Sequence, residues 1–412
     1  MLKDILMQAW EAMVFNRRRT TITIIGMAWG IATVVLLLAY GAGFNRAIEA
    51  IFANWGTTLI GAFPGRTSEQ AGGDKAGVKI QLTQDDVDAV WNSVPGLIHI
   101  SPLVSKEATV QDDLHSFNWT VNGVLPPTQE ILHLPTETGR FFNGEEELER
   151  AHVAVIGSEA KTKLFSGAYA IGESIRLNGI RFTIVGVMEP KIQEGDSDAN
   201  RQIYIPFSTM SDIKDTKYLD GIWMNYTGDH ELVEANLRAA LAAAHHFRPS
   251  DHNALHVENL MEQLAQFHIL TAALQVLLAM VGALTLGIAG IGLMNIMFVA
   301  VQQRTREIGI EKALGARKRH ILLQFLAEAF VITGVGGVLG IMLAELVSVM
   351  VGRITLYSAM ATNAENADIY LKISLSSVLV ATGILVVTGL VSGMIPAIRA
   401  ANLDPIEALR YE

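Results

Sequence analysis

The chain of 412 residues is 50% hydrophobic yet 17% charged, and its formal net charge is −10. A purely soluble protein seldom carries so many apolar residues, and a purely helical membrane bundle carries fewer charges. The composition therefore favours a few membrane spans joined to one sizeable soluble domain. The sequence contains no cysteine, which excludes disulfide bonds and thiolate metal sites.

The negative charge is concentrated between residues 45 and 268, where 30 acidic and 17 basic residues give a net charge of −13. The remainder has 11 acidic and 14 basic residues, a net charge of +3. An acidic bulk with basic membrane-proximal ends argues against nucleic acid as a partner.

Residues 1–19 predict an amphipathic helix on the cytoplasmic membrane surface, because apolar residues from Leu2 to Val14 recur at helical spacing. Three arginines at 17–19 follow, and the uncharged run 20–44 is long enough to cross a hydrocarbon core of about 30 Å. This run exceeds the apolar core of a cleaved signal peptide. We therefore expect an uncleaved first span with its N-terminus in the cytoplasm.

Three further apolar segments predict spans at 269–301, 325–351 and 373–398. The first of these would make a helix of roughly 50 Å, so we expect part of it to project as a stalk. Of the 14 Lys and Arg outside 45–268, 12 lie near the N-terminus, in the loop 302–324 or near the tail 399–412. Only two bracket the short outer loop 352–372. This asymmetry predicts both termini in the cytoplasm and the domain 45–268 outside it.

Small residues four positions apart let helix backbones approach closely in lipid. We expect three such pairs to mark packing seams between spans: Gly26 and Gly30, Gly336 and Gly340, Gly389 and Gly393. Two acids also lie in the third span. We expect Glu328 near the cytoplasmic interface, because a charge at mid-bilayer costs about 3 kcal/mol; the depth of Glu345 stays open.

The segment 45–268 mixes strands, hairpins and helices, which predicts an α+β domain large enough for two subdomains. The pattern predicts strands at 59–62, 97–104, 108–111, 117–124, 153–156, 174–177, 181–187, 203–205 and 222–226, and helices at 83–93, 158–165 and 229–244. The clearest hairpin is at Asn178-Gly179, a dipeptide that suits a type I′ turn.

The loop after the second span carries six basic and two acidic residues between positions 302 and 320. Apolar residues at three- and four-residue steps predict a short helix that ends at Gly315: Ile310, Ala313 and Leu314. Arg304 is three residues before Glu307 and can pair with it. The spacing leaves two interpretations open, a solvated basic loop that fixes topology or a small helix that passes force from a partner to two spans.

We find no pattern typical of an active site. The sequence has no G-x-x-x-x-G-K-[ST] nucleotide-binding loop and no G-x-S-x-G nucleophile elbow. The one histidine cluster has Pro249 between its pairs, which favours a solvated turn over a zinc site: His245, His246, His252 and His256. We expect no catalytic residue, cofactor or metal in this chain.

Several motifs resemble the FtsX/MacB-type permeases of ABC transporters. In the loop they are R-E-I-G-I-E-K-A-L-G-A at 306–316 and Q-F-L-A-E-A at 324–329. In the domain they include V-A-V-I-G-S at 153–158 and I-G-E-S-I-R-L-N-G-I-R-F-T-I-V-G-V at 171–187, which resemble the MacB-like periplasmic core domain. The resemblance implies four spans, with a hairpin-rich subdomain inserted at about 127–213.

In that family the loop is a coupling helix that docks on an ATPase, so the resemblance assigns coupling to the residues of this motif: Glu307, Ile308, Gly309, Lys312, Ala313, Leu314 and Gly315. Because no nucleotide loop is present, we expect a separate ABC ATPase chain as partner. We also expect a second permease copy, most simply as a homodimer, in the bacterial inner membrane. The resemblance leaves open a membrane-fusion adaptor and outer-membrane channel.

Two functions remain open at this point. The first is a permease that exports or extracts a substrate as the ATPase closes. The second is an FtsX-like signal transmitter that activates an outer partner without transport. The full two-part outer domain implied by the resemblance favours export or extraction.

Overall fold

The computed structural model describes residues 17–70, 76–194, 199–355, 358, 361–362 and 365–409. The chain divides into two compact units. The helical unit comprises residues up to Arg46, Ile269–Ile354 and Ile369–Glu412, and the α+β domain comprises Ala47–His268 and Thr355–Asp368. The surface helix predicted at 1–19 lies, for residues 1–16, outside the described residues.

Four long helices form the helical unit: α2 (Arg17–Ala53), α9 (Leu260–Gln303), α11 (Lys318–Val351) and α12 (Leu375–Ala401). All four are long and apolar enough to cross a membrane, at the places where hydropathy predicts spans. Each helix extends beyond its predicted span at one end or more, most of all α2, which continues past residue 44, and α9, which begins nine residues before position 269. The 44 residues of α9 make about 66 Å of helix.

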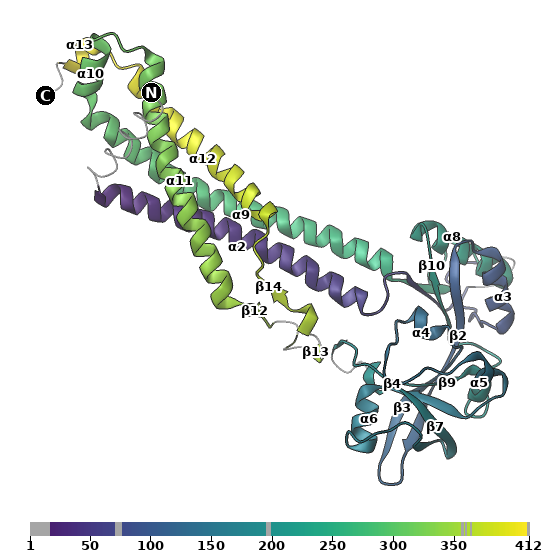
Figure 1. Ribbon diagram of the computed structural model, residues 1–412. Coiled ribbons are helices and arrows are strands. Elements are labelled where there is room, and N and C mark those ends of the chain that lie inside the picture. Colours follow the sequence, from purple (N-terminus) through teal and green to yellow (C-terminus); the bar gives the residue numbers. More distant parts are fainter. Residues whose placement is uncertain are drawn as a thin grey trace. The chain divides into compact units, whose positions relative to one another are not determined.

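The four helices pack around a shared apolar core, to which each contributes. Met27 and Ile31 of α2 meet Leu286 of α9, Ala344 of α11 and Leu385 of α12. Helices α11 and α12 lie side by side (Figure 1). Near their connection a short antiparallel pair forms between β12 (Arg353–Ile354) and β14 (Ile369–Tyr370).

The α+β domain is built on a ten-stranded sheet with the order β11-β1-β10-β2-β3-β9-β5-β7-β4, and β6 pairs with β2 and β7. Its strands are β1 (Leu59–Pro64), β2 (Leu97–Gln111), β3 (Ser116–Val124), β4 (Thr136–Gly139), β5 (Val153–Ile156), β6 (Ser174–Leu177), β7 (Ile180–Met188), β9 (Ile203–Pro206), β10 (Gly221–Tyr226) and β11 (Leu255–Asn259). The pairs β3–β9 and β5–β7 are parallel and the others are antiparallel. A separate pair joins β8 (Gln193–Glu194) to β13 (Ala361–Thr362).

The helices of the domain are α3 (Gln84–Ser93), α4 (Thr128–Ile131), α5 (Gly144–Leu148), α6 (Ser158–Phe165), α7 (Phe207–Met210) and α8 (His230–His245). Helices α3 and α8 cover one face of the sheet and share its largest core, which includes Val90 and Leu241. A second, smaller cluster contains Leu59 and Tyr204. Since Leu59 and Ile60 belong to different clusters, the alternation of side chains along β1 separates the two faces.

The structure changes several strand predictions. The strands expected at 97–104 and 108–111 are one continuous strand, β2, because residues 104–111 all pair with β3. Strands β4 and β11 were not predicted. The Asn178-Gly179 turn has the expected positive φ angles of 49° and 89°. Strands β4 to β9 fall within the insert expected at 127–213 and join the remaining sheet through β9 on β3 and β6 on β2.

Candidate functional site

The loop between α9 and α11 folds into a short helix, α10 (Thr305–Ala313). Its end has the hydrogen bonds of a Schellman motif: the Gly315 N–H donates to the Lys312 carbonyl (3.1 Å) and the Ala316 N–H to the Glu311 carbonyl (3.0 Å). Gly315 has a φ of +100°, so the predicted stop lies where the backbone needs a glycine.

One face of α10 packs against its own chain. Ile308 is 3% exposed and belongs to a cluster with Val301 of α9, Phe325 of α11 and Ala397 of α12. Gly309 is buried as well. We expected both residues to occupy a groove of a partner, but the spans next to the loop cover this face. The exposed residues of α10 lie on the opposite face.

Polar contacts fasten the loop to two neighbouring helices. The Lys312 ammonium donates to the carbonyls of Ala401, at 3.0 Å, and Leu403, at the C-terminal end of α12. This end carries the negative pole of the helix dipole and unsatisfied carbonyls. Arg304 forms an ion pair with Glu328 of α11, at 3.3 Å between Nη1 and Oε2, instead of the expected partner Glu307.

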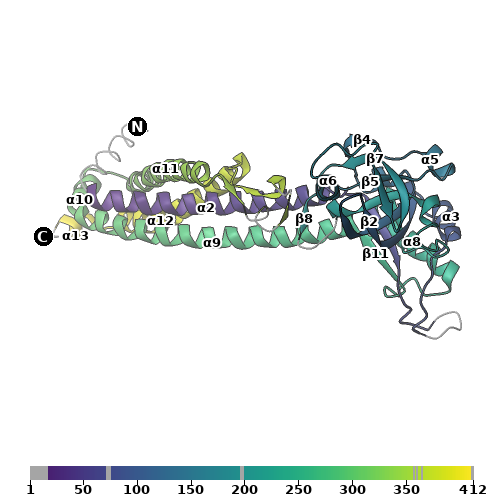
Figure 2. The same cartoon turned by 90° about the horizontal axis from the view of Figure 1, so that it is seen from below.

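The short helix α13 (Pro405–Leu409) packs beside α10 (Figures 1 and 2). Leu314 is 84% exposed, Ile310 46% and Ile406 of α13 70%. Glu307 and Ala313 are exposed on the same loop. We call the exposed apolar side chains of Leu314, Ile310 and Ile406 the loop surface. Exposed apolar residues beside polar ones are typical of protein-docking sites.

Helix α13 beside α10 was not predicted from the sequence, although the sequence contains the signals of a helix start. Asp404 caps the helix by accepting a hydrogen bond from the Ile406 N–H (2.8 Å), and Pro405 stands at the first helical position. Sequence reasoning treated Lys312 as a partner contact, whereas its ammonium is bound within the chain.

Five of the six predicted seam glycines lie at close helix contacts. A Cβ on Gly336 would lie 2.7 Å from the Met27 Cβ, and one on Gly393 would lie 2.6 Å from the Ala329 Cβ. Added Cβ atoms at three others would contact neighbouring helices in the same way: Gly30, Gly340 and Gly389. Gly26 differs, because no described atom outside its own helix surroundings lies within 4 Å of an added Cβ.

In the described part of the chain, no three His, Asp or Glu side chains lie close enough together to hold a metal ion. His245 instead lies 2.9 Å from the buried carboxylate of Asp86, on the neighbouring helix α3. Burial raises the pKa of Asp86, but the hydrogen bonds from His245 and Thr83 outweigh it and lower that pKa below its usual value. His256 lies exposed on β11.

Two family models match the chain, the first over α2 and most of the α+β domain and the second over the C-terminal helices. Residues 20–240 match the MacB-like periplasmic core domain and residues 279–405 match the FtsX-like permease C-terminal domain. The domain also resembles the crystal structure of the periplasmic region of MacB from Actinobacillus actinomycetemcomitans. This likeness covers 54% of the present chain and 97% of that one, at 19% identity and a TM-score of 0.43.

Curated relatives match over the whole length of the chain. A macrolide export ATP-binding/permease protein MacB of Bdellovibrio bacteriovorus is 33% identical over 411 residues, which cover 99% of this chain and 61% of the relative. A pyoverdine export ATP-binding/permease protein PvdT of Pseudomonas putida is 33% identical over 419 residues, covering 100% and 60%. The chain thus spans about three fifths of the length of these relatives. It is a multi-pass membrane protein and belongs to the FtsX/MacB-type permease family of ABC transporters.

Proposed function

We propose that the chain is the permease subunit of an ABC transporter and couples ATP hydrolysis by an ABC ATPase to motion of its α+β domain, by which a substrate is exported or extracted. The loop surface is the observation that carries this proposal. It combines exposed apolar residues with firm attachment to three spans, since α10 follows α9 directly and is bonded to α11 and α12. A solvated topology signal needs neither feature.

The 412 residues contain no P-loop, so the proposed ATPase lies outside them. The names of the relatives, which refer to export of a macrolide and of pyoverdine, support an organic molecule as cargo. We propose the bacterial inner membrane as location, with both termini and α10 in the cytoplasm, and a homodimer as the working unit. The scheme leaves open whether an adaptor and an outer-membrane channel also take part.

The test replaces an exposed residue of the loop surface in the full chain. Leu314→Asp places a charge on a side chain that is 84% exposed, so it should leave the fold intact. In the docked complex the same carboxylate would be desolvated against an apolar groove. The assay measures ATP hydrolysis by the cognate ATPase with and without the permease in lipid vesicles. We expect the increase in hydrolysis rate caused by the Leu314→Asp permease to be at least tenfold smaller than that caused by the unaltered permease. Ala313→Trp, also on the exposed face, should have the same effect.

Leu148→Asp is the matched control, because Leu148 is 85% exposed on α5 of the α+β domain. Like Leu314→Asp, it replaces an exposed leucine by a carboxylate, and it should leave ATPase stimulation unchanged because it lies outside the loop surface. Normal stimulation by the Leu314→Asp permease would return the loop to the role of a topology signal.

A further inference from the structure

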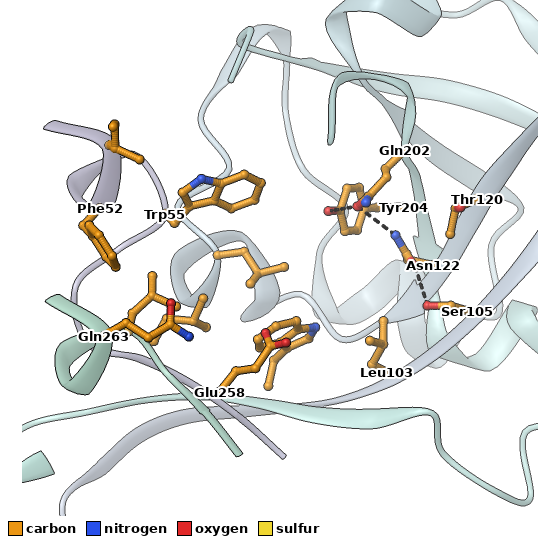
Figure 3. A pocket seen from close by; sticks show the side chains of 15 residues that line it. Phe52, Trp55, Leu103, Ser105, Thr120, Asn122, Gln202, Tyr204, Glu258 and Gln263 are labelled. Carbon is orange, nitrogen blue, oxygen red and sulfur yellow. Dashed lines mark hydrogen bonds between the residues drawn. The ribbon is translucent and has the colours of Figure 1, made fainter. Parts of the chain in front are cut away.

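The α+β domain contains a cavity of about 470 Å³ on the face of the sheet opposite α3 and α8 (Figure 3). Side chains of paired residues lie on the same face of a sheet, and the pairing places Ser105 of β2, Asn122 of β3 and Tyr204 of β9 in one row. On β10 and β11, Trp223 and Glu258 both pair with Gly61 of β1. A volume of this size is typical of sites for drug-sized ligands.

One wall of the cavity is a chain of hydrogen-bonding groups. The Ser105 hydroxyl donates to the Asn122 side-chain carbonyl (2.6 Å), and the Asn122 amide donates to the Gln202 side-chain carbonyl (3.1 Å). The Tyr204 hydroxyl donates to the same Gln202 oxygen (2.7 Å). These bonds hold the polar side chains in place, and Figure 3 shows them together on one side of the cavity. Fixed polar groups of this kind orient a bound ligand and make a pocket specific for it.

The facing wall is aromatic. Phe52 is in the last turn of α2 and Trp55 lies two residues beyond its end. Trp223 belongs to β10 of the sheet itself and lies across Gly61, where a Cβ would be 2.5 Å from its ring. The Lys191 ammonium lies 4.3 Å from the centre of the Trp55 ring and donates to the carbonyls of Asn54 and Leu132. These contacts fix the position of the Trp55 ring beside the cavity.

Glu258 is the only charged side chain among the described residues that line the cavity. Among the described residues, the one basic group within 4.0 Å of the Glu258 carboxylate is His256, which is 71% exposed and whose Nε2 lies 3.8 Å from Glu258 Oε1, too far for a hydrogen bond. The Lys191 ammonium beside the Trp55 ring is bound to the carbonyls of Asn54 and Leu132. Trp223 lies on the same face of the sheet, and the faces of indole rings attract cations. A carboxylate close to tryptophan rings favours a positively charged ligand over an anionic one.

The cavity also reaches the ends of two candidate spans. Phe52 is in the last turn of α2, and Leu260 and Gln263 are in the first turn of α9. A bound molecule would therefore touch the sheet and both helix ends together, so that a displacement of either helix would change its contacts.

We propose that this cavity binds an amphipathic organic cation, with its apolar scaffold against Trp55 and Trp223, its amine toward Glu258 and its hydrogen-bonding groups on Asn122 and Gln202. The role as a cargo site rests on the proposed function, whereas binding itself does not. None of the cavity residues belongs to the loop surface, so the two proposals can fail separately.

The experiment measures binding to the purified full chain in lipid nanodiscs, without ATPase, after subtraction of empty nanodiscs. The probes are rhodamine 6G as an amphipathic cation, N-phenyl-1-naphthylamine as a neutral probe and 8-anilinonaphthalene-1-sulfonate as an anion. We expect saturable binding that is tightest for rhodamine 6G. Glu258→Gln should weaken rhodamine 6G binding about tenfold and leave the neutral probe within twofold, because only the charge is removed.

The control is Glu262→Gln, since Glu262 lies four residues further along, does not line the cavity and is exposed. It should bind all probes as the unaltered chain does. Trp223→Leu should weaken both the cation and the neutral probe at least fivefold, with the melting temperature recorded to verify folding. Absence of saturable rhodamine 6G binding, or equal binding by the Glu258→Gln chain, or an equal loss in Glu262→Gln, overturns the proposal.

Discussion

The contact between α2 and α11 gives the sharpest test of the helical packing, at Gly340. A Cβ at this position would overlap the Ile31 Cγ2 and lie 2.5 Å from the Ala28 carbonyl oxygen. Because part of this obstacle is backbone, α2 and α11 must move apart to admit a methyl group. Overpacking of this kind costs about 1–3 kcal/mol, while replacing a helical glycine by alanine stabilises the helix by about 1 kcal/mol.

Gly334→Ala is the matched control on the same helix, because no described atom outside the local helix backbone lies within 4 Å of an added Cβ there. It should keep the propensity gain without the clash. The two variants should therefore differ by about 1–3 kcal/mol in free energy of unfolding, with Gly340→Ala the less stable. Titration of the purified chain with SDS in mixed micelles, followed by tryptophan fluorescence, measures this difference. Equal stability of the two variants would refute the close approach of α2 to Gly340.

Two further predictions use other parts of the chain. Burial raises the pKa of Asp251, but hydrogen bonds from Ser68 and the Glu69 N–H outweigh it and bring the pKa to about 2, below the usual 3.8. The lowered pKa stabilises the fold above about pH 4 and this stability is lost as the pH falls toward 2, so Asp251→Asn should cost about 2 kcal/mol at pH 7 in denaturant melts and almost nothing at pH 2. In this cysteine-free chain, an impermeant thiol reagent added outside cells should label a cysteine at Ser116 but not one at Gln303; labelling of the second would contradict the proposed topology.

Local patterns were enough to predict the four long helices, since hydropathy alone decides whether a segment can span a membrane. The Asn178-Gly179 turn was predictable for a similar reason, because only a few dipeptides adopt its positive φ angles. Strand β2 was expected as two pieces, with the polar residues Ser105, Lys106 and Glu107 between them. These residues continue the strand because they pair with β3, and Ser105 is one of the polar groups of the cavity.

Which face of α10 is buried could not be predicted from the sequence of so short a helix. Ile308 in the helix and Leu314 directly after it are both large apolar residues, yet Ile308 is 3% and Leu314 is 84% exposed. The difference arises because α11, which follows directly in the sequence, and α12, which is far away in the sequence, cover one side. The cavity escaped prediction for the same reason, since it gathers side chains from segments between Ile51 and Gln263 that no local period connects.

The bonds around α10 determine where a force applied to the loop surface would go. A loop joined only to its flanking helices would pass a push to α9 and α11 through the chain and leave α12 unaffected. The Lys312 ammonium ties the loop to the carbonyl end of α12, and the Arg304–Glu328 pair, with Glu328 only 7% exposed, adds a side-chain link to α11. The Arg304 side chain is 29% exposed, but Glu328 is buried, so separating the loop from α11 would leave a buried carboxylate without its partner, which is unfavourable. Force on Leu314 and Ile310 would therefore move the ends of α9, α11 and α12 together, as the proposed coupling requires.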